Sequence, residues 1–98
     1  MNLRPFHLAI PVKNLSESMT FYEKILGCIR GRKDRHWVDY NLFGHQLVLH
    51  EDKNSIKKEH FNEVDGKSVP IPHFGVVLEW NEFKIFSKKL IKQKIDFQ

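Results

Sequence analysis

The chain has 98 residues, of which 41% are hydrophobic and 29% charged. This length fits one domain or part of one. The proportion of hydrophobic to charged residues excludes a disordered chain and fibrous repeats. The net charge of +4 is spread along the chain, and its densest basic segment, residues 30–35, has no aromatic side chains, which argues against nucleic-acid binding. No apolar run approaches the ~20 residues of a membrane span, and a single cysteine, Cys28, excludes a disulfide scaffold and favours a reducing cytoplasm. We therefore expect a cytoplasmic protein with no membrane or nucleic-acid partner.

Residues 6–12 alternate in character with a period of two, which predicts a strand with one apolar face. His7 and Ala9 share the opposite face of this strand. Asn14 follows as an N-cap residue, with a glutamate three residues later, and predicts a helix that ends at Gly27. The chain thus begins with a strand and a helix.

Three further strands are predicted over residues 28–32, 36–43 and 45–51, the last two joined as a hairpin by a two-residue turn at Gly44 and His45. One face of this hairpin is apolar and suits the core. The other face carries Trp37, Asp39, Asn41, Gln46, Val48 and His50. Such a mixture is too polar for a core and too aromatic for an ordinary solvent-exposed face, so it indicates a binding surface.

The predicted turn places Asp39 opposite His50 across the hairpin. A carboxylate in that position can orient the imidazole, which makes both residues catalytic candidates for general acid–base chemistry; the alternative is an ordinary polar pair. We assign Trp37, Asn41 and Gln46 to a substrate pocket on the same face, with a half-exposed strand surface as the alternative.

The rest of the chain contains a polar connector, residues 53–70, then a strand over residues 73–78 and a helix capped by Asn81. We expect three units. Residues 1–52 form a first module, the connector follows, and residues 71–98 form an incomplete second module made of a strand and a helix.

The two strand–helix openings resemble each other. His7 shares its face with Ala9, and His73 shares its face with Gly75, so each imidazole has a very small neighbour. Taken singly, each histidine fits a buried structural role, but the matched placement in two copies favours metal ligation, since imidazole is the commonest ligand for divalent transition metals. The repeat predicts an α+β fold, with one complete βαβββ module followed by the βα start of a second.

Four runs carry a resemblance to a known family: FHLAIPV (6–12), LSESMTFYEKILG (15–27), HWVDYNLFGHQLV (36–48) and VPIPHFGVVL (69–78). In order and spacing they resemble the vicinal oxygen chelate superfamily, which includes glyoxalase I, fosfomycin and bleomycin resistance proteins and extradiol dioxygenases. The resemblance covers essentially the whole chain and is strongest to bacterial proteins described only as extradiol-dioxygenase-like.

The resemblance implies a divalent metal held by His7 and His73, with a glutamate from the last strand of a module as the third ligand. The corresponding position of the first module falls near Val48, which cannot bind a metal. The resemblance therefore places the glutamate beyond residue 98, as expected for a chain truncated at its C-terminus. Two histidines and one carboxylate favour Fe(II), with Mn(II), Ni(II) or Zn(II) as alternatives.

The function implied is a metal-dependent enzyme, glyoxalase- or dioxygenase-like, whose small substrate chelates the metal through vicinal oxygens; ring-opening dioxygenation and lyase or isomerase chemistry both stay open. The alternatives are a non-catalytic protein of the same fold that binds small molecules such as antibiotics, and an inactive truncated product. Because the second strand and helix lack sheet partners within their own copy, we expect a homodimer, which can exchange elements between subunits.

Overall fold

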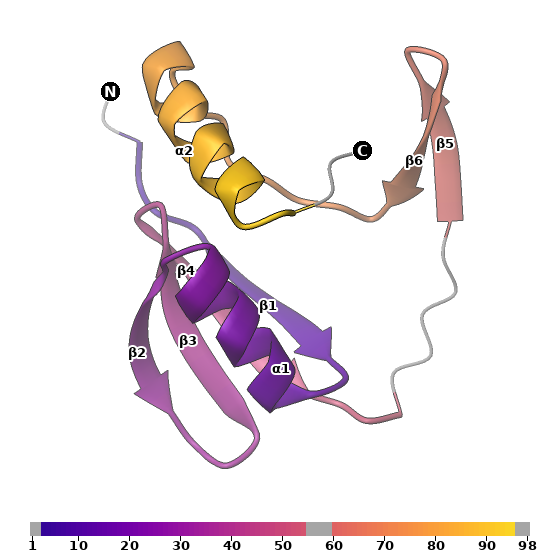
Figure 1. Ribbon diagram of the computed structural model, residues 1–98. Helices are drawn as coiled ribbons and strands as arrows, with labels where there is room; N and C mark the ends of the chain where they lie inside the picture. Colours follow the sequence, from indigo (N-terminus) through magenta and orange to yellow (C-terminus); the bar gives the residue numbers. More distant parts are fainter. Residues whose placement is uncertain (1–2, 55–59, 96–98) are drawn as a thin grey trace.

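A computed structural model describes residues 3–54 and 60–95 of the chain (Figure 1). Its elements in chain order are β1 (His7–Val12), α1 (Leu15–Thr20), the π-helical turn η1 (Phe21–Ile25), β2 (Ile29–Lys33), β3 (Trp37–Leu42), β4 (His45–Glu51), β5 (His60–Val64), β6 (Lys67–Ile71) and α2 (Trp80–Lys92). The elements from β1 to β4 form the predicted βαβββ module, and the predicted α+β class is confirmed.

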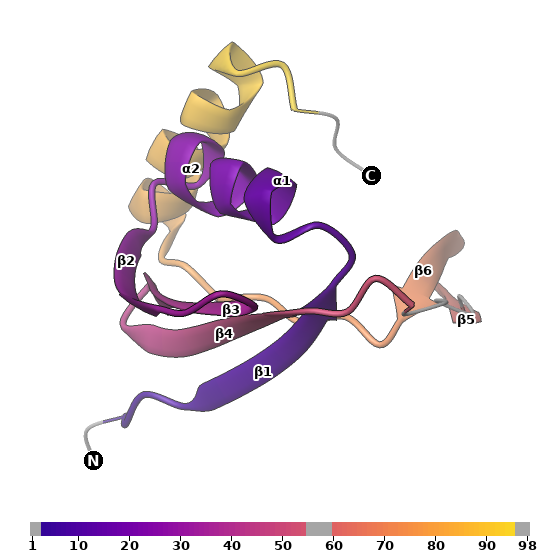
Figure 2. The same cartoon turned by 90° about the horizontal axis from the view of Figure 1, so that it is seen from below.

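The module is built on a four-stranded sheet in the order β1-β4-β3-β2, with β1 parallel to β4 and the other neighbours antiparallel. Figure 2 shows α1 and α2 on the same side of this sheet. Among the described residues no helix covers the opposite side, which we call the open face. The sheet therefore has one face that carries the helices and one face that no described helix covers.

The core lies between α1 and the helix side of the sheet. It consists of Leu15, Val38, Tyr40, Leu42, Leu47 and Leu49. Val38 and Leu49 are 0% exposed, and burying each such side chain contributes about 1.5–3 kcal/mol. Cys28 packs against this core, and burial raises the pKa of its thiol. The apolar hairpin face predicted from the sequence is confirmed.

The first helix begins and ends where capping chemistry predicts. Asn14 Oδ1 accepts a hydrogen bond from the Glu17 backbone N–H at 2.9 Å, and the Glu51 carboxylate accepts one from the Leu15 N–H, also at 2.9 Å. The bond from Leu15 is the largest of the effects that hold the pKa of Glu51 below its ordinary value. Gly27 ends the helix with a φ of 74°, in a conformation that side chains disfavour. These contacts hold α1 against the end of β4.

The hairpin between β3 and β4 turns one residue earlier than the sequence predicts. Phe43 and Gly44, with φ of 50° and 88°, form the turn, so that Leu42 pairs with His45. Asn41 supports this left-handed turn, because its Oδ1 accepts a hydrogen bond from the Gly44 N–H at 2.8 Å. The change shifts the pairing by two residues, which exchanges cross-strand partners but leaves every side chain on its predicted face.

The new pairing overturns one prediction. Asp39 faces Val48, and His50 faces Trp37, so the expected cross-strand pair of Asp39 and His50 is wrong. The physical reason is that the left-handed backbone begins at Phe43, which the glycine signal alone did not reveal.

Part of the predicted connector is a β-hairpin. Strands β5 and β6 pair antiparallel around a turn at Asp65 and Gly66, with φ of 52° and 76°, and an Asp-Gly turn is a common hairpin signal. The hairpin forms a separate two-stranded sheet whose described side chains are largely exposed. Because exposed side chains are mostly polar, the composition of this hairpin resembles that of a linker.

The strand predicted over residues 73–78 does not form in the described part of the chain. A strand needs a neighbour for its N–H and C=O groups, and neither of the two described sheets includes this segment. The helix predicted next forms as α2, but Asn81 does not cap it: the N-cap is Glu79, which makes no side-chain capping bond, and Asn81 lies in the first turn. The helix contacts the module through Phe86, whose ring centroid lies 5.3 Å from that of Phe43. No described helix, α2 included, is long and apolar enough to cross a bilayer.

Candidate functional site

A row of polar side chains crosses the open face, with one residue from each strand of the four-stranded sheet. His7 (β1) hydrogen-bonds Gln46 (β4), Nδ1 to Oε1, at 2.9 Å, and Gln46 Nε2 donates to Asp39 Oδ2 (β3) at 3.4 Å. Arg32 (β2) donates to the same Asp39 oxygen through Nε at 3.0 Å. The strand order places these four residues on neighbouring strands, and we call them the polar row.

The polar row favours one tautomer of a neutral His7 ring. Gln46 directs its amide NH₂ at the Asp39 carboxylate, so its carbonyl oxygen faces His7 and can only accept. Nδ1 of His7 must therefore carry the proton, which leaves the Nε2 lone pair of the neutral ring free. Histidines that bind metals commonly hold their second ring nitrogen in this way.

Asp39 is the anchor of the polar row. It is 6% exposed, and its Oδ1 also accepts the Arg32 backbone N–H at 2.6 Å. A break in the β2–β3 register between Arg30 and Lys33 turns that N–H toward the carboxylate, and Gly31 leaves the room, since a Cβ there would collide with Asp39. Hydrogen bonds from Arg32, the backbone N–H first, hold the pKa of Asp39 below its ordinary value. Asp39 is thus an ionised group with occupied oxygens, which suits anchoring better than proton transfer.

His50 does not join the polar row. Its cross-strand neighbour is Trp37, and it is exposed. Asp39, the carboxylate expected to orient it, bonds Arg32 and Gln46 instead. A catalytic role for His50 stays a prediction without the partner expected for it.

Two of the three predicted substrate-binding residues line a hollow on the open face. Asn41 and Gln46 lie there together with Asp39, and the hollow has a volume of about 320 Å³. Asn41 uses its Oδ1 on the hairpin turn, so its NH₂ group is the part that can meet a ligand. Trp37, the third predicted residue, does not line the hollow; it lies under the Arg32 guanidinium, whose carbon is 5.6 Å from the ring centroid.

His73 holds its ring in the same way as His7. Its Nδ1 lies 2.7 Å from the Pro70 carbonyl oxygen, which can only accept, so Nε2 is again the free nitrogen. His45 shows the opposite arrangement: its Nδ1 accepts from the Phe6 N–H at 2.9 Å, and its ring stacks on Phe6 with centroids 4.2 Å apart. Because Nε2 of the neutral His45 ring then carries the proton, only the two predicted ligands among these three histidines offer a free Nε2.

The described residues do not assemble a complete metal site. No group of three His, Cys, Asp or Glu side chains that could hold an ion together occurs in residues 3–54 and 60–95. Hydrogen bonds connect His7 to Gln46 and His73 to Pro70, and not to a common partner. The two histidines thus supply suitable donor atoms, but no third ligand joins them in residues 3–54 and 60–95.

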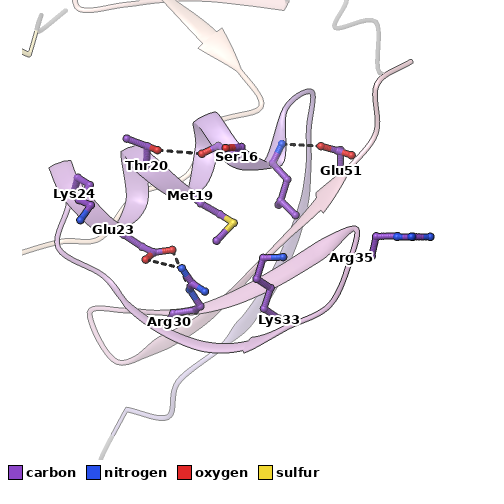
Figure 3. A pocket seen from close by; sticks show the side chains of 10 residues that line it. Ser16, Met19, Thr20, Glu23, Lys24, Arg30, Lys33, Arg35 and Glu51 are labelled. Atoms are coloured by element: carbon purple, nitrogen blue, oxygen red, sulfur yellow. Dashed lines mark hydrogen bonds and ion pairs between the residues drawn. The ribbon is translucent and has the colours of Figure 1, made fainter.

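A larger cleft, of about 490 Å³, lies on the helix side between α1, η1 and β2 (Figure 3). There Glu23 accepts two hydrogen bonds from Arg30, at 3.1 and 3.0 Å, and one from the Tyr40 hydroxyl at 2.6 Å. These bonds, led by those from Arg30, lower the pKa of Glu23, and burial raises the pKa of Tyr40. Glu23 thus joins the helix to the sheet, and none of the predicted site residues lines this cleft.

Arg32 is the member of the polar row that the sequence did not indicate. It belongs to the basic segment of residues 30–35, whose charges alone suggest a solvated surface. The available signal is Gly31, because a glycine inside a predicted strand often marks a bulge or the close approach of another group.

Comparison with known proteins identifies the superfamily to which this chain, with its βαβββ module and open face, belongs. The model of the glyoxalase/bleomycin resistance protein/dioxygenase superfamily matches residues 4–97, and the chain belongs to this superfamily. A search of the curated proteins finds no match.

Two solved structures are similar over most of the chain. A glyoxalase/bleomycin resistance protein/dioxygenase from Alicyclobacillus acidocaldarius has 31% sequence identity and a TM-score of 0.72 over 95% of this chain. An integron cassette protein from the mobile metagenome of the Halifax Harbour sewage outfall has 29% identity and a TM-score of 0.68 over 91% of this chain. The chain spans 65% and 69% of the lengths of these two proteins.

Proposed function

We propose that the protein is a metal-dependent enzyme in which Nε2 of His7 and Nε2 of His73 bind one divalent ion. The observation that supports this proposal is the shared state of the two rings. Nδ1 of each ring lies at hydrogen-bond distance from an acceptor oxygen, at 2.9 Å in His7 and 2.7 Å in His73, an arrangement that leaves Nε2 of a neutral ring free. His45, whose Nδ1 is an acceptor, does not fit that role.

The proposed ion is Fe(II), with Mn(II), Ni(II) and Zn(II) as alternatives, because two imidazoles and a carboxylate suit these ions. The carboxylate is a further part of the proposal and rests on the family resemblance. When bound, the ion would act as a Lewis acid toward two neighbouring oxygens of a small substrate. Ring-opening dioxygenation and isomerase or lyase chemistry are both compatible with this arrangement.

The chain's own residues would prepare the ligand and the pocket. Gln46 holds the His7 ring so that Nε2 is the free nitrogen, and Asp39 with Arg32 keeps the Gln46 amide in the required orientation. Asn41 lines the hollow in which a substrate would lie. Each residue therefore acts by orienting a neighbour or by shaping the space beside it.

A second candidate function is non-catalytic binding of a small molecule. The platform formed by Trp37 and the Arg32 guanidinium favours it, because a flat ring beside a cation can hold an aromatic ligand with no metal. In that case metal content would not change the affinity for such a ligand.

Metal quantification after anaerobic loading with Fe(II) and desalting tests the first proposal. We expect His7→Gln and His73→Gln to bind Fe(II) at least about tenfold more weakly, since losing only the hydrogen-bond partner of a ligand costs 10–100-fold. His45→Gln is the matched control and should bind as the unchanged protein does. Equal metal content in all four proteins would rule out the assigned ligands.

We extend the proposal to a homodimer that can exchange elements between subunits. The apolar side of α2 supports it, because Trp80, Phe83 and Ile91 are at least half exposed, at 67%, 50% and 61%. Residues 73–78 also have no strand partner in the described part of the chain. Light scattering at micromolar concentration should give twice the chain mass, and a monomer would contradict the proposal.

A further inference from the structure

The cleft on the helix side has no part in the proposed function, although it is larger than the hollow on the open face. Its volume is about 490 Å³, against about 320 Å³ for that hollow. One wall is formed by α1 and η1, and the other by β2, the edge strand of the sheet. Figure 3 shows Met19 pointing from the helix toward the strand and Lys33 pointing from the strand toward the helix. A ligand between these walls would therefore meet both side chains.

The two carboxylates that line the cleft are already engaged. Arg30 donates to both oxygens of Glu23, at 3.1 and 3.0 Å. One oxygen of Glu51 accepts the Leu15 backbone N–H at 2.9 Å, and the other lies 3.6 Å from Nδ1 of His36. These acidic groups therefore contribute to the structure of the walls rather than to the neutralisation of further cations.

Three further cations line the cleft without an ion-pair partner among the described residues: Lys24, Lys33 and Arg35. Figure 3 shows Lys33 in the middle of the lining, with the other two cations toward opposite ends. Lys33 Nζ donates to the Asp34 carbonyl oxygen at 3.1 Å. That acceptor is neutral, so it leaves the charge of the ammonium and its other donors available. The cleft therefore favours an anion, and Lys33 is placed to meet it.

Apolar surface beside these cations favours a ligand with more than charge. Leu15 is 5% exposed and belongs to the core, and Met19 packs against that core while it also lines the cleft. The methionine side chain is unbranched and polarisable, so it adapts to apolar groups of different shape. An apolar chain laid on this surface would gain free energy by leaving water.

We propose that this cleft binds a small amphiphilic anion, with the charged head at Lys33 and the apolar chain on Met19. The site lies on the side of the sheet opposite the polar row and needs no metal, so it is independent of the proposed function. A ligand held there joins α1 to the edge strand β2, and because it binds only the folded chain it also stabilises the module.

NMR of the methionine methyl groups tests the inference, since the chain has two methionines and Met19 lines the cleft. Protein with ¹³C-labelled methionine methyls is titrated with octanoate, which has a charged head and an apolar chain, and with the two half-ligands acetate and 1-octanol. Met19→Leu identifies the Met19 signal. We expect octanoate to shift this signal saturably at millimolar concentration. Acetate and 1-octanol should each bind at least about tenfold more weakly, because each lacks one of the two interactions.

Lys33→Gln should weaken octanoate binding by about three- to tenfold, as expected for the loss of one exposed charged contact, and should leave the binding of 1-octanol unchanged. Lys84→Gln is the matched control, because Lys84 lies over the Trp80 ring on α2, outside the cleft; it should bind octanoate as the unchanged protein does. A Met19 signal that does not respond to octanoate would overturn the inference. Equal affinities for octanoate and either half-ligand, or an equal effect of Lys33→Gln and Lys84→Gln, would overturn it as well.

Discussion

Replacing Asp39 with asparagine keeps the shape of the side chain and removes the charge that anchors the polar row. The carboxylate is 6% exposed and accepts two hydrogen bonds from Arg32, at 2.6 and 3.0 Å. Bonds to a charged acceptor contribute about 1.5–3 kcal/mol, against about 0.5–1.5 kcal/mol for neutral ones. Asparagine keeps only one acceptor oxygen, so one of the two bonds becomes a weaker neutral bond and the other is lost. We expect a total loss of about 2 kcal/mol, because the exposure of the Arg32 side chain keeps the loss from being larger.

Urea denaturation at pH 7 measures this loss as a change in the free energy of unfolding. For a chain of this length, about 2 kcal/mol corresponds to a decrease in Tm of about 8–16 °C. Asp34→Asn is the matched control: its carboxylate accepts only a local bond, from the Arg35 N–H at 2.7 Å, and it is exposed. If Asp39→Asn unfolds within about 0.5 kcal/mol of Asp34→Asn, the polar row does not stabilise the module as argued.

The same variant predicts a pH dependence. The pKa of Asp39 is lowered in the folded protein, chiefly by the Arg32 backbone N–H, so its charge contributes stability above the ordinary value of 3.8. That contribution disappears as the pH falls from about 4 through the lower folded-state pKa. The stability gap between the unchanged protein and Asp39→Asn should therefore be constant near neutrality and narrow below about pH 4. A gap that widens on acidification would refute the reasoning.

Two further substitutions test the packing around the site. Gly31→Ala should destabilise the protein by about 1–3 kcal/mol in urea denaturation, because its Cβ would collide with Asp39. Gly75→Ala is the control: a Cβ there meets nothing within 4 Å, so it should change stability by less than about 0.5 kcal/mol. Equal effects of the two substitutions would contradict the close approach of Gly31 to Asp39. Tyr40→Phe removes the hydroxyl that donates to Glu23 at 2.6 Å and should lower the unfolding free energy by about 1–2 kcal/mol, so an unchanged Tm would show that this bond contributes nothing.

Much of the module could be predicted because its signals repeat along the chain. The period-two pattern identified the apolar face of the β3–β4 hairpin, and this result survives the two-residue error in pairing, since such a shift leaves each side chain on its face. The N-cap at Asn14 and the left-handed Gly27 likewise follow from local chemistry. The period-two pattern of the first strand likewise predicted that His7 lies on the open face.

The remaining features depend on contacts that local patterns do not encode. A phenylalanine rarely adopts a positive φ, so the turn at Phe43 could not be read from residue preferences, and the expected contact between Asp39 and His50 failed with it. The bulge that turns Arg32 toward Asp39 depends on pairing between β2 and β3. The described side chains of the β5–β6 hairpin form no buried face, so the polar composition of this segment concealed the hairpin despite the Asp-Gly signal.

The central claim is that His7 and His73 share one protonation state and bind one ion through Nε2. Nitrogen NMR of the histidine rings in ¹⁵N-labelled protein tests it most directly, before and after addition of Zn(II). We predict Nδ1–H tautomers for both histidines in the metal-free protein and a Zn(II)-induced shift of both Nε2 signals, while His45 keeps its Nε2–H tautomer and does not respond. An Nε2–H tautomer at His7, or Zn(II) shifts confined to other histidines, would contradict the account.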